Sequence, residues 1–141
     1  MGRAFLFRLA TCLGLAIAGI AFAQESAPLP TLQWQGGLPT TGREYPTQAL
    51  ERGIAGNATL CCTLATDLHV ACRVTDSPPY HFGDAALVIS RRLLLTPESA
   101  EALRQSGRGV ELYYTFDGGR GSIRIGRWVI VQTGSCPLAA E

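Results

Sequence analysis

Cysteine is the residue type with the most reactive chemistry in this chain. The 141-residue sequence contains five cysteines, and Cys61, Cys62 and Cys72 lie close together with His69 between them. Such a group could ligate a metal ion or act as a redox centre, but the sequence has no Cys-x-x-Cys pair. If Cys12 is removed with an export signal, four cysteines remain, and an even number in an exported chain favours structural disulfides.

The spacing of these cysteines places two of them on one face of a predicted β-hairpin. Apolar and polar residues alternate from Ala58 to Val74 on both sides of a turn, which is typical of two strands with one buried face. If Leu64 pairs with Val70, the same register places Cys62 opposite Cys72. Directly opposed strand residues are close enough for a disulfide, so the sequence predicts a Cys62–Cys72 bridge.

Cys61 points to the opposite face of that hairpin, which separates it from its neighbours and argues against one tetrahedral metal site. The fourth cysteine, Cys136, lies near the end of the chain. Cys61 and Cys136 either form a second bridge or link two copies of the chain, and the sequence does not decide between these arrangements. We expect no metal and no cofactor.

The other side chains capable of catalysis lack the partners that they would need. His69 alternates outward on a predicted strand, and His81 lies in a Pro-rich loop. A histidine-activated nucleophile needs a positioned Ser or Cys and an orienting acid, and the chain has no Gly-x-Ser-x-Gly pattern. The glycines around Arg120 favour a hairpin turn over a phosphate-binding loop, because no helix clearly follows them. We therefore expect neither an enzyme nor a small-molecule substrate.

The N-terminal residues predict export. Arg3 and Arg8 precede an apolar run that ends in a small-x-small site at residues 21–23, the pattern of a cleavable signal peptide covering residues 1–23. The run is shorter than the roughly 20 residues of a spanning helix, which favours cleavage and a periplasmic location over an inner-membrane anchor. A net charge of +1 argues against binding of nucleic acid through a general basic field.

The remaining residues predict one small α+β domain. An extended arm over residues 24–44 is rich in Pro, Gly and Thr. Helical or alternating spacing of apolar residues predicts, besides the hairpin, a short helix from Tyr45-Pro46, helices over 83–94 and 98–105, and strands over 110–116 and 122–132. This order favours a small antiparallel sheet with helices packed on one face.

Residues 45–116 resemble the C-terminal domain of TonB-like proteins. The matching features, in order, are Tyr45-Pro46 with Ala49, Gly53 and Gly56, the hairpin, Ser77-Pro78, Phe82-Gly83-Asp84-Ala85-Ala86-Leu87, Pro97, and Gly109-Val110 leading to Phe116. The chain is most similar to exported members with a cysteine in each hairpin strand, here Cys62 and Cys72. The family implies a protein that grips a short segment of an outer-membrane receptor and transmits energy for nutrient uptake.

The resemblance also implies how the partner binds. The receptor segment adds as a strand to the sheet edge, and the matching strand consists of Val110, Glu111, Leu112, Tyr113, Tyr114, Thr115 and Phe116. The partner would be an extended segment of a receptor or another envelope protein, and a second copy of the chain is a further candidate. Residues 117–141, expected to form a hairpin strand and a tail, could instead pair with that strand and cover its edge.

Two functions follow from this resemblance. The first is a periplasmic protein-binding module associated with TonB-dependent transport. The alternative is a stand-alone structural or interaction protein of the cell envelope that keeps the fold without transducing energy. The alternative is favoured by the cleavable leader, by the added terminal strand, and by the absence of a long Pro-rich spacer from the sequence.

Overall fold

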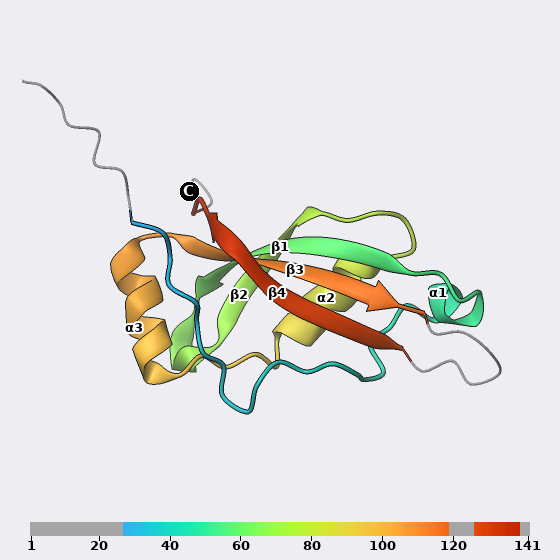
Figure 1. The fold of residues 1–141 in the computed structure, drawn as a ribbon, viewed down its shortest axis with the longest axis horizontal. Helices are drawn as coiled ribbons and strands as arrows, with labels where there is room; N and C mark the ends of the chain where they lie inside the picture. Colours follow the sequence, from blue (N-terminus) through green and yellow to red (C-terminus); the bar gives the residue numbers. More distant parts are fainter. Residues whose placement is uncertain (1–26, 119–125, 139–141) are drawn as a thin grey trace, which may run out of the picture.

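The computed structural model describes residues 27–118 and 126–138 (Figure 1), so the predicted signal peptide lies outside the described residues. The elements are α1 (Thr47–Glu51), β1 (Gly56–Leu64), a 3₁₀ turn (Thr66–Leu68), β2 (Val70–Asp76), α2 (Phe82–Ser90), α3 (Pro97–Ser106), β3 (Gly109–Asp117) and β4 (Arg127–Cys136). The strands form one antiparallel sheet in the order β2-β1-β3-β4. In Figure 1, α2 crosses behind the sheet, and α3 and α1 lie at its two ends. The predicted α+β class is confirmed.

The register of the predicted hairpin is confirmed residue by residue. Strand β1 pairs with β2 so that Leu64 faces Val70 and Cys62 faces Cys72. Both strands run two residues beyond the predicted outer ends, to Gly56 and Asp76. The alternation of apolar residues determines this register, because a shift by one residue would turn every buried side chain toward solvent.

The turn of this hairpin holds two non-glycine residues in left-handed backbone conformations. Asp67 has φ 59° and Leu68 has φ 65°. Leucine is disfavoured there because its Cβ crowds the backbone. The turn is held by a hydrogen bond from the Leu95 amide to the Leu68 carbonyl, at 2.9 Å. Contacts with a distant segment of the chain therefore hold Leu68 in a conformation that it disfavours.

Replacing Leu68 by glycine should give a more stable protein than replacing it by alanine. Both variants lose the half-buried leucine side chain, but only alanine keeps the left-handed strain, which should cost about 1 kcal/mol. Urea denaturation of the two variants measures this difference directly. An alanine variant at least as stable as the glycine variant would show that the turn carries no such strain.

Helix α2 is shorter than predicted. The expected helix over 83–94 ends at Ser90, although the buried Leu93 continues its apolar face. Arg91 and Arg92 form a turn, and the chain then leaves the helix because its main-chain groups have other partners: Leu94 pairs with His69, and Leu95 pairs with Trp34. Tertiary hydrogen bonds thus replace the last helical turn that the spacing predicts.

Helix α3 forms where its ends predict it. The Thr96 hydroxyl accepts a hydrogen bond from the Ser99 amide at 3.3 Å, Pro97 occupies the first turn, and Gly107 ends the helix in a left-handed conformation. Its observed span, Pro97–Ser106, includes the predicted 98–105.

Strand β4 pairs with β3 along its whole length. The predicted strand over 122–132 begins in the described residues at Arg127 and continues to Cys136, and residues 122–125 lie outside the described residues. Pairing runs from Gly109 opposite Cys136 to Asp117 opposite Arg127. A register shift after Glu111 introduces a bulge, so that the two halves of β4 differ in phase by one residue.

The sheet buries one face and leaves the other open. The buried face carries the even-numbered residues of β1 and β3, and α2 packs against it. An aromatic cluster forms the core at one end, where Phe116 contacts Tyr45, Phe82 and Trp128 with ring centroids 5.1–6.2 Å apart. The open face carries exposed side chains, among them Thr115, Val129 and Val131.

Candidate functional site

The predicted partner-binding strand lies inside the sheet. Strand β3 pairs with β1 on one side and with β4 on the other. Its edge is therefore covered, and the expectation that Val110–Phe116 receives a partner strand is wrong for main-chain pairing. The strand that covers this edge is β4, which belongs to the C-terminal residues that the sequence allows to pair with β3. Since both edges of β3 are paired, an added strand would have to use another edge of the sheet.

The side chains of β3 divide between the two faces. Those of Val110, Leu112, Tyr114 and Phe116 are buried in the core. Burial also raises the pKa of the Tyr114 phenol far above its ordinary value, so this hydroxyl stays neutral. Glu111, Tyr113 and Thr115 lie on the open face, where Tyr113 is opposite Val131 and Thr115 is opposite Val129. Of Val110–Phe116, these three are the residues whose side chains are not buried and can contact a partner.

Strand β2 is the edge strand on the other side of the sheet. The Cα atoms of Cys62 and Cys72 are 4.0 Å apart, which identifies a non-hydrogen-bonded pair, since hydrogen-bonded pairs are about 5.5 Å apart. The amide and carbonyl of Cys72 therefore point away from β1, and by alternation so do those of Val70 and Val74. Leu94 forms an isolated antiparallel bridge with His69 at the start of this edge. From Ala71 to Asp76, no strand or bridge among the described residues pairs with it.

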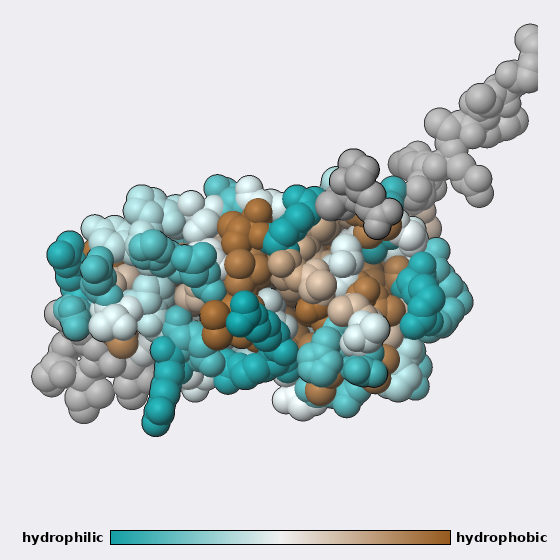
Figure 2. Space-filling model, turned by 180° about the vertical axis from the view of Figure 1, so that it is seen from behind, coloured by the Kyte–Doolittle hydropathy of each residue, from teal (hydrophilic) through white to brown (hydrophobic). Residues whose placement is uncertain are grey.

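Helix α2 lies alongside this edge and forms one wall of a groove. A Cβ on Gly83 would lie 3.1 Å from the Val74 side chain and 2.8 Å from the Ser77 hydroxyl, so a glycine is needed where the helix approaches β2. Leu87 lies one turn further along the same helical face and is half-buried. Figure 2 shows apolar residues gathered over α2 and toward α3 on this side of the molecule.

The loop after β2 closes one end of the groove. A hollow of about 380 Å³ lies between Val74, Pro79 and Gly83. Tyr80 and His81 have φ of 72° and 59°, two consecutive left-handed residues without glycine. Such strain persists only where surrounding contacts impose it. Here the Ser77 hydroxyl accepts a hydrogen bond from the Gly83 amide at 2.7 Å and fastens the loop to the helix.

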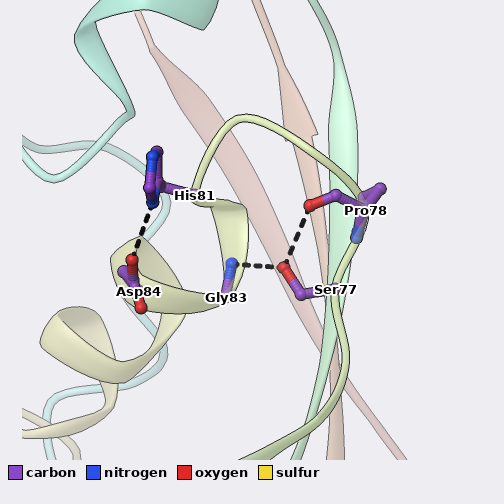
Figure 3. A network of polar contacts seen from close by, with 5 residues as sticks. All are labelled: Ser77, Pro78, His81, Gly83 and Asp84. Atoms are coloured by element: carbon purple, nitrogen blue, oxygen red, sulfur yellow. Dashed lines mark hydrogen bonds and ion pairs between the residues drawn. The ribbon is translucent and has the colours of Figure 1, made fainter.

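The polar side chains of this loop form two separate networks (Figure 3). His81 Nδ1 contacts Asp84 Oδ2 at 3.0 Å, whereas the Ser77 hydroxyl is bonded to the main chain of Gly83 and Pro78. His81 and Asp84 are both exposed and turn away from Ser77 in the figure. The loop therefore presents a serine, a histidine and an aspartate without the chain of contacts that a catalytic triad needs.

All four cysteines of the described residues are paired in two disulfides. The predicted Cys62–Cys72 bridge is confirmed. The question left open by the sequence is answered by a second bridge within the chain, between Cys61 and Cys136. The two bridges lie on opposite faces of β1, because adjacent strand residues point in opposite directions. The first stiffens the hairpin that ends in β2, and the second fixes the end of β4 to β1.

A scan against protein-family models, a search of curated proteins and a search of solved structures each gave no match to this chain. Within residues 27–118 and 126–138, no helix is both long and apolar enough to cross a membrane. The candidate site therefore rests on geometry: a free strand edge, a helix beside it and a constrained loop at its end. Sequence reasoning missed this edge, because only the placement of β4 shows that β2 and β4, and not β3, lie at the two borders of the sheet.

Proposed function

We propose that the protein is an exported, TonB-like protein-binding module whose sheet receives an extended segment of an outer-membrane receptor or another envelope protein. The segment pairs with the free edge of β2. The observation that carries this proposal is the pair of outward-pointing sets of main-chain groups at Cys72 and Val74, beyond the His69–Leu94 bridge, where no strand pairs with β2 among the described residues. Main-chain pairing supplies affinity in such complexes, and the pockets beside the strand supply specificity.

The two disulfides support this proposal. Disulfides persist in oxidising compartments such as the periplasm, in keeping with the predicted signal peptide. The Cys62–Cys72 bridge lies at the centre of the proposed binding strand and holds it against β1. A rigid edge loses little conformational freedom when a segment binds, which favours affinity.

A second candidate is a stand-alone structural or interaction protein of the cell envelope without energy transduction. One observation favours it: β4 covers the strand that the TonB-like resemblance assigns to the receptor, and the Cys61–Cys136 bridge locks β4 in place. Binding of N-terminal peptides of TonB-dependent receptors distinguishes the two candidates. The transport module should bind them, whereas the structural protein should not.

Replacing Val74 by proline should reduce peptide binding at least about tenfold. Proline removes an amide that points away from the sheet, so it blocks strand addition and leaves the β1–β2 hydrogen bonds intact. The matched control is Val74→Ala, which removes the half-buried side chain but keeps the amide. Isothermal titration calorimetry with the receptor peptides measures both variants.

The control separates the amide from the side chain. We expect Val74→Ala to retain wild-type affinity within about threefold, since one side chain of the edge strand contributes little to main-chain recognition. Equal affinities of the two variants, or equal losses in both, would contradict pairing at this edge. A circular dichroism melt confirms that each variant remains folded at the assay temperature.

A further inference from the structure

A short segment of the N-terminal arm is held in an extended conformation by hydrogen bonds to a second part of the chain. The Gln35 amide donates to the Leu94 carbonyl at 2.7 Å, and the Thr96 amide donates to the Gln33 carbonyl at 3.1 Å. These bonds flank an antiparallel bridge between Trp34 and Leu95. Ser99 is more than nine-tenths buried, and its hydroxyl accepts from the Gln33 amide at 2.7 Å.

The opposite side of the same segment is held by one side chain. The Gln132 carboxamide accepts from the Leu32 amide at 2.9 Å and donates to the Pro30 carbonyl at 3.0 Å. A neighbouring strand would likewise offer one donor and one acceptor to the main chain. Gln132 thus takes the place of a neighbouring strand. Its two hydrogen bonds involve only the main chain of the segment, so they do not depend on the side chains of the segment.

Two side chains of the segment supply its apolar contacts. Leu32 is buried, with 4% of its surface exposed, and Trp34 packs half-buried against the core. The Gln33 side chain between them is exposed. Beyond Gln35 the chain turns at Gly36 and Gly37, which both have a positive φ. A Cβ added to either glycine would have no heavy atom of a more distant residue within 4 Å. The segment Pro30–Gln35 therefore lies in a slot and joins the domain through an open glycine turn.

We propose that this slot is a binding site for an extended segment of a partner protein in which a leucine is followed two residues later by a tryptophan. The chain's own residues 30–35 occupy the slot when the partner is absent. This inference is independent of the β2 edge. Because the arm is tethered, its effective concentration at the slot is on the order of millimolar, so a partner competes only when the arm is weakened or its own contacts are better.

A synthetic peptide of residues 27–37 tests this proposal on the full chain. We expect the Leu32→Ala chain, whose arm is weakened, to bind the fluorescein-labelled wild-type peptide at least about tenfold more tightly than the wild-type chain does. Adding Gln132→Ala to that variant should weaken binding at least about tenfold again, since two hydrogen bonds are lost. Fluorescence anisotropy gives all three affinities.

Two variant peptides and a second variant of the chain serve as controls for this test. A peptide with Leu32→Ala should not bind, whereas one with Gln33→Ala should bind like the wild type, because only the main chain of Gln33 is used. If Leu32→Ala unfolds the chain, Gln35→Pro weakens the arm without touching the core. The proposal fails if neither weakened, folded chain binds the peptide better than the wild type. It also fails if the wild-type chain dimerises by exchanging arms, since a second copy would then be the occupant.

Discussion

Replacing Cys61 and Cys136 by alanine should lower the free energy of unfolding by about 4.5 kcal/mol in the chain-entropy account, because the bridge joins residues 75 positions apart. Loss of the Cys62–Cys72 bridge, which spans 10 positions, should cost about 2.7 kcal/mol. Urea denaturation with linear extrapolation gives both values. The short-loop pair is the matched control, and a larger loss from that pair than from the long-loop pair would contradict this account.

Gly109 gives an independent readout of the same bridge. A Cβ at this position would lie 2.7 Å from the Cys136 sulfur and 3.0 Å from the Cys61 sulfur, because the bridge crosses directly over β3. Gly109→Ala should therefore be destabilising in the oxidised protein by about 1–3 kcal/mol. Part of that loss should disappear in the chain without the bridge, where only the Cys62 carbonyl remains within 2.9 Å. Equal losses in both backgrounds would show that the sulfur atoms do not cause the conflict.

Replacing Phe82 by alanine should lower the free energy of unfolding by about 3–5 kcal/mol. Phe82 is 1% exposed, and its ring contacts Tyr45 and Phe116 with centroids 5.8 and 5.1 Å apart. The truncation leaves a cavity between α2 and the sheet that rigid neighbours cannot fill. Val88 lies on the same helix with 44% of its surface exposed, so Val88→Ala is the matched control and should cost less than about 1 kcal/mol.

A second glycine tests the position of this ring. A Cβ on Gly56 would lie 2.2 Å from the Phe82 ring, so Gly56→Ala should destabilise the wild-type protein by about 1–3 kcal/mol through overpacking. In the Phe82→Ala background the added methyl enters the cavity, and its effect should vanish or change sign. A double-mutant cycle measures this coupling. Additive losses would mean that the ring does not lie over Gly56.

The hairpin was predictable because its signal is local. Alternating side chains on both strands and a short turn allow one register that buries Leu60, Cys62 and Val70 together. The end of α2 was not predictable in this way. Leu93 continues the helical spacing, yet Leu94 and Leu95 are extended because the Gln35 and Leu68 main chains bond to them. Local periodicity carries no information about partners that lie so far away in the sequence.

The Cys61–Cys136 disulfide depends on a β-bulge that could not be predicted from the sequence. Trp128 and Ile130 face the core, so strict alternation along β4 would turn Cys136 toward the core as well. The bulge after Glu111 shifts the phase by one residue and places Cys136 opposite Gly109, on the face that carries Cys61. The Gln132 contacts could not be predicted either, because a side-chain amide that bonds to the main chain leaves no periodic pattern in the sequence.

The placement of adjacent cysteines on opposite faces of β1 also orders the oxidative folding of the chain. The four cysteines of the described residues allow three complete pairings, but a hairpin that forms early presents Cys62 to Cys72 and turns Cys61 away from both. Cys61 must then wait as a free thiol until β4 has paired with β3 and brought Cys136 to it. The Cys61–Cys136 bond therefore forms only once the whole sheet has assembled, whereas the Cys62–Cys72 bond needs only the hairpin.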